Sequence, residues 1–191
     1  TYTEKGTIYG IWAWVQCLVP MISGGFTDQY GYKKSLYVAY SVNILGYLAF
    51  AVATGFWGAL GAACLVGFGT AIFKPPVQGT VAKASTQENS SVAWGFFYWM
   101  VNVGGFAAPF LAAILRGETN WQLVFYCAAG VTAFNFIPTI FFYREPERDP
   151  NYQRKTVGQT TIDTLKTLRD KDFVIFLAIF SGFWFMFMQL W

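Results

Sequence analysis

The sequence contains no histidine, and this absence excludes several kinds of active site. Without an imidazole the chain cannot supply a Ser-His-Asp triad, a Cys-His pair or a histidine metal ligand. It has only three cysteines, and none belongs to a Cys-x-x-Cys pair. Because Cys17, Cys64 and Cys127 each lie inside an apolar run, we expect buried thiols and neither a metal site nor a disulfide framework. The sequence therefore does not predict an enzyme.

Charged residues are scarce as well. Asp, Glu, Lys and Arg make up 12% of the chain, about half their share in a soluble domain, whereas 55% of the residues are hydrophobic. A net charge of +3 is too small to predict a nucleic-acid partner. Charges are missing altogether from residues 6–27, 36–73, 89–115, 121–143 and 173–191. This pattern predicts an all-α, multi-pass integral membrane protein in a lipid bilayer.

Six segments are long and apolar enough to be transmembrane helices, which need about 20 residues each. They lie at roughly 6–25, 35–54, 57–80, 92–115, 121–143 and 173–191. The uncharged stretch 36–73 exceeds any single span, so we expect a tight turn at Thr54-Gly55-Phe56. The chain starts at Thr1 without a Met and stops within an apolar run, which favours a fragment of a longer protein.

Residues 144–172 form the one substantial hydrophilic stretch. Within it, apolar residues recur at near-helical spacing beside basic ones, at Val157, Ile162, Leu165 and Leu168. This spacing predicts an amphipathic helix on the inner membrane surface, and the alternative is a solvated linker with some helical propensity.

The basic residues predict an orientation. Eleven of the thirteen Lys and Arg residues lie in or beside the loops near 28–34, 80–91 and 144–172. Only Lys5 and Arg116 lie on the other side. Because cytoplasmic loops carry an excess of Lys and Arg, we expect these three loops to be cytoplasmic.

The first of these loops carries a recognisable motif. It reads Gly24-Gly25-Phe26-Thr27-Asp28-Gln29-Tyr30-Gly31-Tyr32-Lys33-Lys34. Gly31 permits a tight turn, Asp28 can cap the following structure or pair with a base, and the lysines hold the loop inside. The loop resembles the G-x-x-x-D-x-x-G-x-[RK]-[RK] signature of the major facilitator superfamily. The resemblance implies that Gly24, Asp28, Gly31, Lys33 and Lys34 belong to a gate that latches two helical halves; an ordinary polar turn is the alternative.

A second motif lies in the third predicted span. It reads Gly67-Phe68-Gly69-Thr70-Ala71-Ile72-Phe73-Lys74-Pro75-Pro76 and is similar to the motif G-x-G-x-x-[FL]-K-P-N of the proton-dependent oligopeptide transporter family. Gly67 and Gly69 correspond to the glycines, and Phe73 and Pro75 flank the lysine as in the motif, with one more residue between the two parts; Pro76 replaces the Asn. The resemblance implies that Lys74 couples proton binding to binding of a peptide carboxylate. The alternative is a lysine that snorkels to the inner interface.

The fourth predicted span contains Phe97-Tyr98-Trp99-Met100-Val101-Asn102-Val103-Gly104, similar to the F-Y-x-x-[IV]-N-x-G run of the same family. Tyr98 and Asn102 share a helical face, and the resemblance implies that they bind the peptide. Asn102 is alternatively an interhelical hydrogen-bonding residue. Gln189 resembles a polar position in the family's seventh helix. Gln16, Asn43 and Asn135 match no motif, and we expect interhelical hydrogen bonds from them.

Together these motifs imply a major facilitator fold of twelve or more helices. Residues 1–143 correspond to helices two to six, 144–172 to the cytoplasmic linker between the halves, and 173–191 to the first helix of the C-terminal half. The resemblance implies proton-coupled symport of di- or tripeptides by alternating access, driven by a proton gradient without cofactor or metal. A superfamily porter for another small solute, and a receptor or assembly protein that does not transport, are the alternatives. The sequence predicts no oligomeric state.

Overall fold

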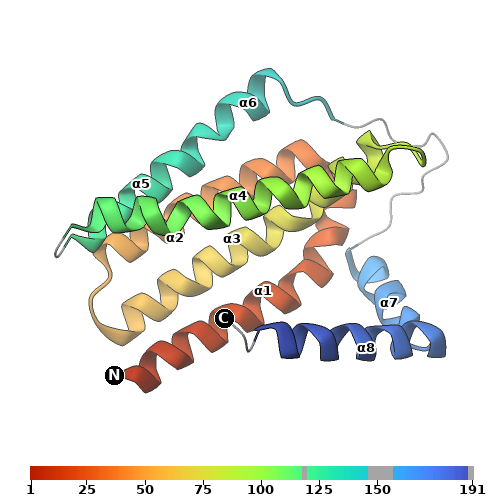
Figure 1. Ribbon diagram of the computed structural model, residues 1–191, viewed down its shortest axis with the longest axis horizontal. Coiled ribbons are helices and arrows are strands. Elements are labelled where there is room, and N and C mark those ends of the chain that lie inside the picture. The colour runs from red at the N-terminus through yellow and green to blue at the C-terminus, as the bar shows by residue number, and fades with distance from the viewer. Residues whose placement is uncertain (118–119, 146–156, 189–191) are drawn as a thin grey trace.

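The computed structural model describes residues 1–117, 120–145 and 157–188, and helices account for nearly all of them (Figure 1). No strand occurs in these ranges. The helices are α1 (Tyr2–Tyr30), α2 (Tyr32–Val52), α3 (Gly55–Ala84), α4 (Ser90–Arg116), α5 (Trp121–Phe134), α6 (Phe136–Phe141), α7 (Val157–Thr167) and α8 (Lys171–Met188).

Five segments of the described chain are long and apolar enough to cross a membrane. They are α1, α2, α3, α4 and the segment Trp121–Phe141, which comprises α5 and α6. The sixth expected span corresponds to α8, and residues 189–191 at its end lie outside the described part. The prediction of an all-α membrane protein is therefore confirmed, although α1 and α3 extend beyond the expected bounds of 6–25 and 57–80.

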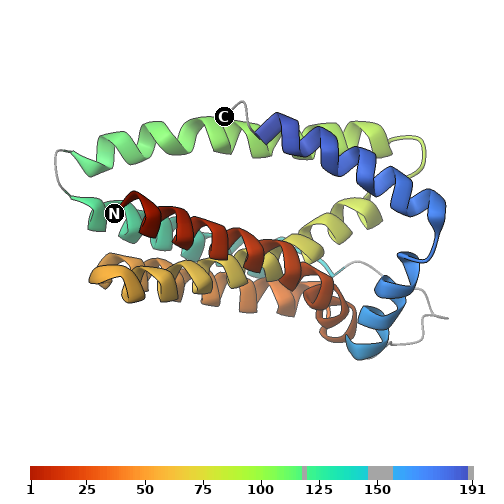
Figure 2. The same cartoon turned by 90° about the horizontal axis from the view of Figure 1, so that it is seen from below.

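The helices form two layers. In the first, α3 packs against α1 and α2, and α5 packs against α2. Figure 2 shows α4 and α8 on one side of this layer. The core lies between α1, α2 and α3, where the small residues Ala63, Gly67 and Ala71 are buried along α3. Small side chains let helix backbones approach closely in lipid. No residue of α4 is buried, so the described helices cover no face of α4 completely.

One end of the bundle gathers the expected cytoplasmic loops. It carries the α1–α2 junction at Gly31, the connection between α3 and α4, and α7, which packs against α1 (Figure 1). We call it the basic end, because most of the described lysines lie there, namely Lys33, Lys34, Lys83, Lys166 and Lys171. The opposite end carries Thr1, the α2–α3 turn and the α4–α5 connection. Within the hydrophilic stretch 144–172, where a helix was expected, α7 is present at Val157–Thr167.

The expected span at 121–143 is present as Trp121–Phe141, with a turn at Asn135 between α5 and α6. Two expectations about single residues are wrong. Asn135 donates to the carbonyl oxygen of Val131 in its own helix (3.3 Å) and makes no interhelical bond to the described residues. Cys17 is exposed on α1, because no described helix covers that face. The expected bond of Asn43 is confirmed, since its amide oxygen accepts from Thr70 of α3 (3.3 Å).

Candidate functional site

The motif glycines bring α3 into close contact with both neighbouring helices. A Cβ atom built on Gly69 would lie 2.7 Å from Cγ of Asn43 on α2. A Cβ atom on Gly67 would lie 3.1 Å from Cδ1 of Trp12 on α1. The space at Gly69 excludes a side chain, and the space at Gly67 is tight; the two glycines therefore let the helix that carries Lys74 pack closely against α1 and α2.

Two prolines follow Lys74 without ending the helix. Pro75 and Pro76 lie inside α3, and Pro76 is fully buried. Proline removes a backbone donor and bends a helix. Figure 2 shows α3 leaving the first layer towards the start of α4. The helix continues to Ala84, beyond the expected end at residue 80, so Lys74 lies well inside it.

Lys74 is half-buried and bonded to a neutral side chain. Its ammonium nitrogen donates to Oε1 of Gln16 on α1 (3.0 Å). In the spans that the structure describes, no other charged residue lies so far from a helix end: ten residues, or about 15 Å, separate Lys74 from Ala84. No described carboxylate forms an ion pair with Lys74. A charge at such a position is costly and calls for an anionic partner.

The side chain of Lys74 extends away from the basic end. Ser23 on α1 donates to the carbonyl oxygen of Ala71 on α3 (2.9 Å), which fixes the relative level of the two helices. Lys74 lies three residues nearer the basic end than Ala71, whereas Gln16 lies seven residues farther from that end than Ser23. A snorkelling lysine extends towards the nearest water. The geometry therefore favours an intramembrane ammonium group.

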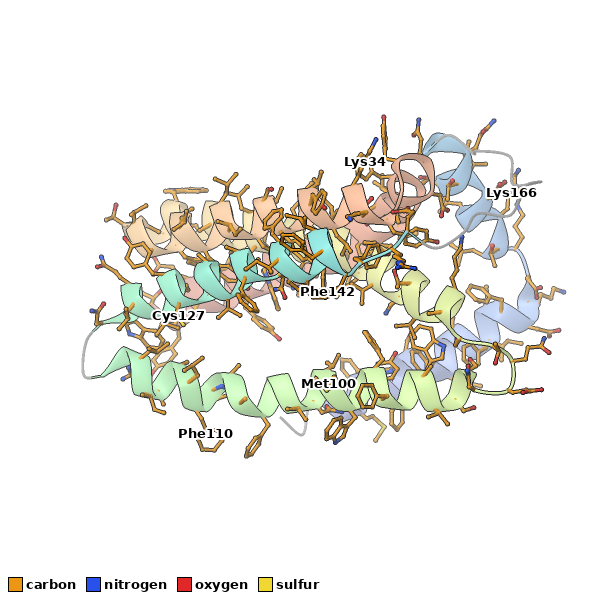
Figure 3. All side chains as sticks on the ribbon, turned by 90° about the horizontal axis from the view of Figure 1, so that it is seen from above. Lys34, Met100, Phe110, Cys127, Phe142 and Lys166 are labelled. Atoms are coloured by element: carbon orange, nitrogen blue, oxygen red, sulfur yellow. The ribbon has the colours of Figure 1, made fainter. Side chains whose placement is uncertain are left out.

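The structure does not bring the other expected binding residues to Lys74. Tyr98 and Asn102 lie on α4, and both are exposed. Among the described residues, the ring contacts of Tyr98 are with Trp94 and Phe97 of its own helix. Figure 3 shows α4, which carries the labelled Met100, apart from the layer that carries Cys127 and Phe142. Gln189 lies outside the described residues.

At the basic end, Glu145 holds the start of α2. Gly31 is the single residue between α1 and α2. Its φ is 101°, a value that glycine adopts readily. The Glu145 carboxylate accepts from the backbone N–H groups of Tyr32 (2.6 Å) and Lys33 (2.8 Å). An anion at a helix N-terminus is favourable, because the first N–H groups lack intrahelical partners. The sequence predicted Asp28 for such a cap or for pairing with a base, but the Asp28 carboxylate makes no hydrogen bond or ion pair with the described residues.

Lys33 and Tyr143 extend this contact. The Lys33 ammonium donates to the carbonyl oxygens of Ile140 (3.2 Å) and Tyr143 (3.3 Å). The hydroxyl groups of Tyr143 and Thr80 are 2.6 Å apart. Burial raises the pKa of Tyr143; the Thr80 hydrogen bond lowers it, and nearby Glu145 raises it further.

We call Tyr32, Lys33, Thr80, Tyr143 and Glu145 the Glu145 clamp. Lys34 is exposed, and the space around Gly24 is open.

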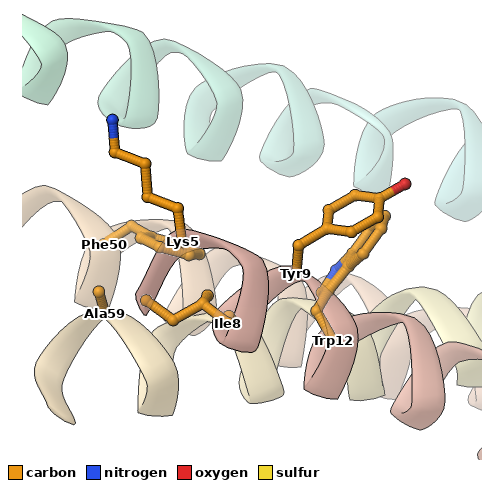
Figure 4. Close-up of a pocket in the computed structure, with 7 residues that line it drawn as sticks. Lys5, Ile8, Tyr9, Trp12, Phe50 and Ala59 are labelled. Carbon is orange, nitrogen blue, oxygen red and sulfur yellow. The ribbon is translucent and has the colours of Figure 1, made fainter. Parts of the chain in front are cut away.

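A groove at the opposite end was not predicted. It has a volume of about 370 Å³, and its lining is apolar except for Lys5 (Figure 4). The lining residues come from α1, α2 and α3: Lys5, Ile8, Tyr9, Trp12, Phe50, Ala59 and Ala63. Such a surface accommodates apolar groups. Among the described residues no group of His, Cys, Asp and Glu is arranged to hold a metal ion.

Comparison with known proteins gives one family. The sequence profile of the Major Facilitator Superfamily matches residues 1–191. Multidrug resistance protein 1 of Bacillus subtilis is 27% identical over 167 residues, which cover 83% of this chain and 40% of that protein. The class H tetracycline resistance protein of Pasteurella multocida is 23% identical over 192 residues, covering 93% of this chain and 44% of that protein. The chain thus spans about two fifths of the length of these relatives.

A solved structure shares the fold. It is the crystal structure of a mutant of the peptide transporter POT in complex with alafosfalin. The TM-score is 0.61 at 18% identity, and the match covers 87% of this chain and 36% of that one. At this identity the likeness concerns the fold alone.

Proposed function

The chain belongs to the Major Facilitator Superfamily of membrane transporters, and from this premise we propose that the whole protein carries di- or tripeptides across the membrane together with protons. Two helical halves alternate access to a central site between them. A proton gradient supplies the energy, and no cofactor takes part. The 1–143 segment belongs to the first half, 144–172 to the linker and 173–191 to the second half.

The observation that carries the proposal is the bond between Lys74 and the neutral Gln16 (3.0 Å). An intramembrane ammonium group without a carboxylate partner attracts an anionic group. The terminal carboxylate of a short peptide is such a group, and it forms charge-assisted hydrogen bonds with an ammonium. The motif around Lys74 and the motif around Asn102, in this order along the chain, support a peptide as the solute.

We assign the peptide backbone to Tyr98 and Asn102. Their hydroxyl and amide groups can both donate and accept hydrogen bonds, as recognition of a peptide unit requires. Both residues are exposed on a helix that buries none of its residues against the rest of the described chain. Gln189 joins this set by its position in the last predicted span.

We place the basic end in the cytoplasm. The charge count of the loops supports this orientation, and the same loops meet at one end of the bundle (Figure 1). The gate at this end consists of the motif residues Gly24, Asp28, Gly31, Lys33 and Lys34, whose loop lies against the start of the linker.

A second candidate is export of drug-like solutes. The names of the relatives favour it, since multidrug and tetracycline resistance proteins are among them. In that case Lys74 would serve an anionic group of another solute, or a carboxylate elsewhere in the whole protein. A receptor that does not transport differs from both candidates, because no solute crosses proteoliposomes that contain it.

The test is uptake of a labelled dipeptide by the full-length protein and its Lys74→Ala variant in proteoliposomes. Losing one charge-assisted contact should lower the rate at subsaturating dipeptide by about 10- to 100-fold. Lys83→Ala is the matched control, because Lys83 lies on the same helix but is exposed near its end. Uptake by Lys74→Ala equal to that of the control would contradict the proposal.

A further inference from the structure

We infer that Gln16 is a positioning and specificity residue of the Lys74 site, which selects solutes carrying a carboxylate. Its amide oxygen holds the Lys74 ammonium group, and its amide NH₂ group is a second donor to the carboxylate. This inference rests on the proposed function and deepens it. No motif in the sequence points to Gln16, and its role follows from its place on α1 opposite Lys74.

Chemistry fixes the orientation of the amide. A lysine ammonium group has three donors and no acceptor. The Gln16 atom 3.0 Å from Nζ of Lys74 is therefore the carbonyl oxygen. The NH₂ group then points elsewhere, and no described residue accepts from it. Lys74 and Gln16 thus present donors from both side chains, while the one acceptor atom between them, Oε1 of Gln16, already accepts from the ammonium group.

A pair of this composition discriminates between solutes. A carboxylate accepts hydrogen bonds only, so it satisfies the ammonium and the amide NH₂ group together. If the solute carries an uncharged amide in place of the carboxylate, its NH₂ group faces the donors of Lys74 and Gln16. The positive charge of the ammonium group is then not balanced by the solute. Selection for a carboxylate over the matching amide is therefore a property of the two residues together.

Gln16 also fixes where the ammonium group lies. Without the amide, the flexible Lys74 side chain is free to turn towards water at the basic end, as lysines near membrane interfaces do. With the amide, Nζ is held towards the level of Gln16, farther inside the bundle. A carboxylate solute then meets a cation at a fixed depth.

The experiment compares a dipeptide with its C-terminally amidated form in full-length protein, unmodified and with Gln16→Leu or Gln16→Glu. Thermal stabilisation of the purified protein by each peptide measures binding, and proteoliposome uptake measures transport. The unmodified protein should prefer the free acid, and Gln16→Leu should reduce the preference about tenfold by removing one donor to a charged group. Gln16→Glu should lose the preference at neutral pH, where the introduced carboxylate pairs with Lys74.

Acidic pH provides the rescue. A protonated carboxyl group has one acceptor and one donor, like the amide it replaces. Preference for the free acid in Gln16→Glu should therefore return as the pH falls, while Gln16→Leu should not recover. A residue that only supports packing would not produce this difference, because both variants fill the same space in α1.

The possible failures are distinct. Dipeptide uptake with an unchanged acid-to-amide ratio in Gln16→Leu would overturn the inference and leave the proposed function standing. Absence of any dipeptide binding or uptake would overturn the proposed function. The inference would then stand only if N-acetylalanine stabilised the unmodified protein more than N-acetylalanine amide did. This difference in stabilisation would also have to disappear in Gln16→Leu. If N-acetylalanine stabilised both proteins equally or neither, the inference would fall as well.

Discussion

Gly69 has less room for a side chain than Gly67, the other glycine of its motif. A Cβ atom there would meet Asn43 at 2.7 Å from Cγ and 2.8 Å from the backbone nitrogen. Because part of this obstacle is backbone, rotation of the Asn43 side chain cannot relieve it. The sequence predicted that small residues pack in this helix, but the particular neighbour could not be predicted, because it depends on the register between α2 and α3.

We therefore predict that Gly69→Ala lowers the free energy of unfolding by about 1–3 kcal/mol, the usual cost of overpacking. Gly61→Ala on the same helix is the control, because no atom lies within 4 Å of a Cβ built there. Thermal unfolding of the purified protein in detergent measures the effect. Equal midpoints for the two variants would show that α2 and α3 are not in the contact described.

Tyr143 gives the Glu145 clamp a dependence on pH. Burial raises its pKa, and the folded protein therefore holds the phenol proton more tightly than the unfolded chain does. The resulting stabilisation is fully present below the unfolded pKa of about 10 and is lost as the pH rises through the raised folded pKa.

We predict that Tyr143→Phe flattens the decline of the melting temperature between about pH 9 and 11. The ring contacts stay, while the titrating hydroxyl group is removed. Tyr30→Phe serves as the control, since Tyr30 is exposed at the end of α1. An alkaline decline as steep in Tyr143→Phe as in the control would exclude a role of this phenol.

At the scale of helices, the lengths of the apolar segments predicted most of the helices but not which helices contact one another. The turn at Thr54-Gly55-Phe56 was expected, and α2 ends and α3 begins there. The break at Asn135 was not expected, because both sides of it are equally apolar. The role of Glu145 was out of reach, since it acts on α2 from 113 residues away in the sequence.

The clamp leads to a prediction for the start of α2. In Glu145→Gln the carboxylate charge is lost, and the contact with the Tyr32 and Lys33 N–H groups weakens. Hydrogen exchange of these two amides should become several-fold faster, while exchange in the middle of α3 should not change. Glu88→Gln, an exposed change in the connection between α3 and α4, should alter neither. Unchanged exchange at Tyr32 in Glu145→Gln would contradict the clamp.

At the scale of the whole molecule, the fold class and the superfamily followed from the sequence, but the separation of α4 did not. The apolar residues of α4 predict a membrane span. They do not indicate whether other helices of the described chain surround α4. Tyr98 and Asn102 were expected beside Lys74 because of the family motifs, but their helix α4 lies in a different layer from α3 (Figure 2). Motif spacing along a chain does not specify the distance between two helices.

The orientation of the whole protein can be tested directly. In a variant without Cys17, Cys64 and Cys127, single cysteines at Lys34 and Lys166 should resist a membrane-impermeant maleimide in intact cells and react after permeabilisation. A cysteine at Trp57, exposed at the α2–α3 turn, should react in intact cells. The opposite pattern would reverse the orientation and place the basic end outside.

The most direct test of the account is accumulation of a labelled dipeptide by the full-length protein in proteoliposomes, with and without an inward proton gradient. We predict accumulation above the external concentration only with the gradient, and its loss in Lys74→Ala. Efflux of a drug-like solute by an intact protein that never accumulates dipeptides would contradict the peptide symport proposal and favour the exporter.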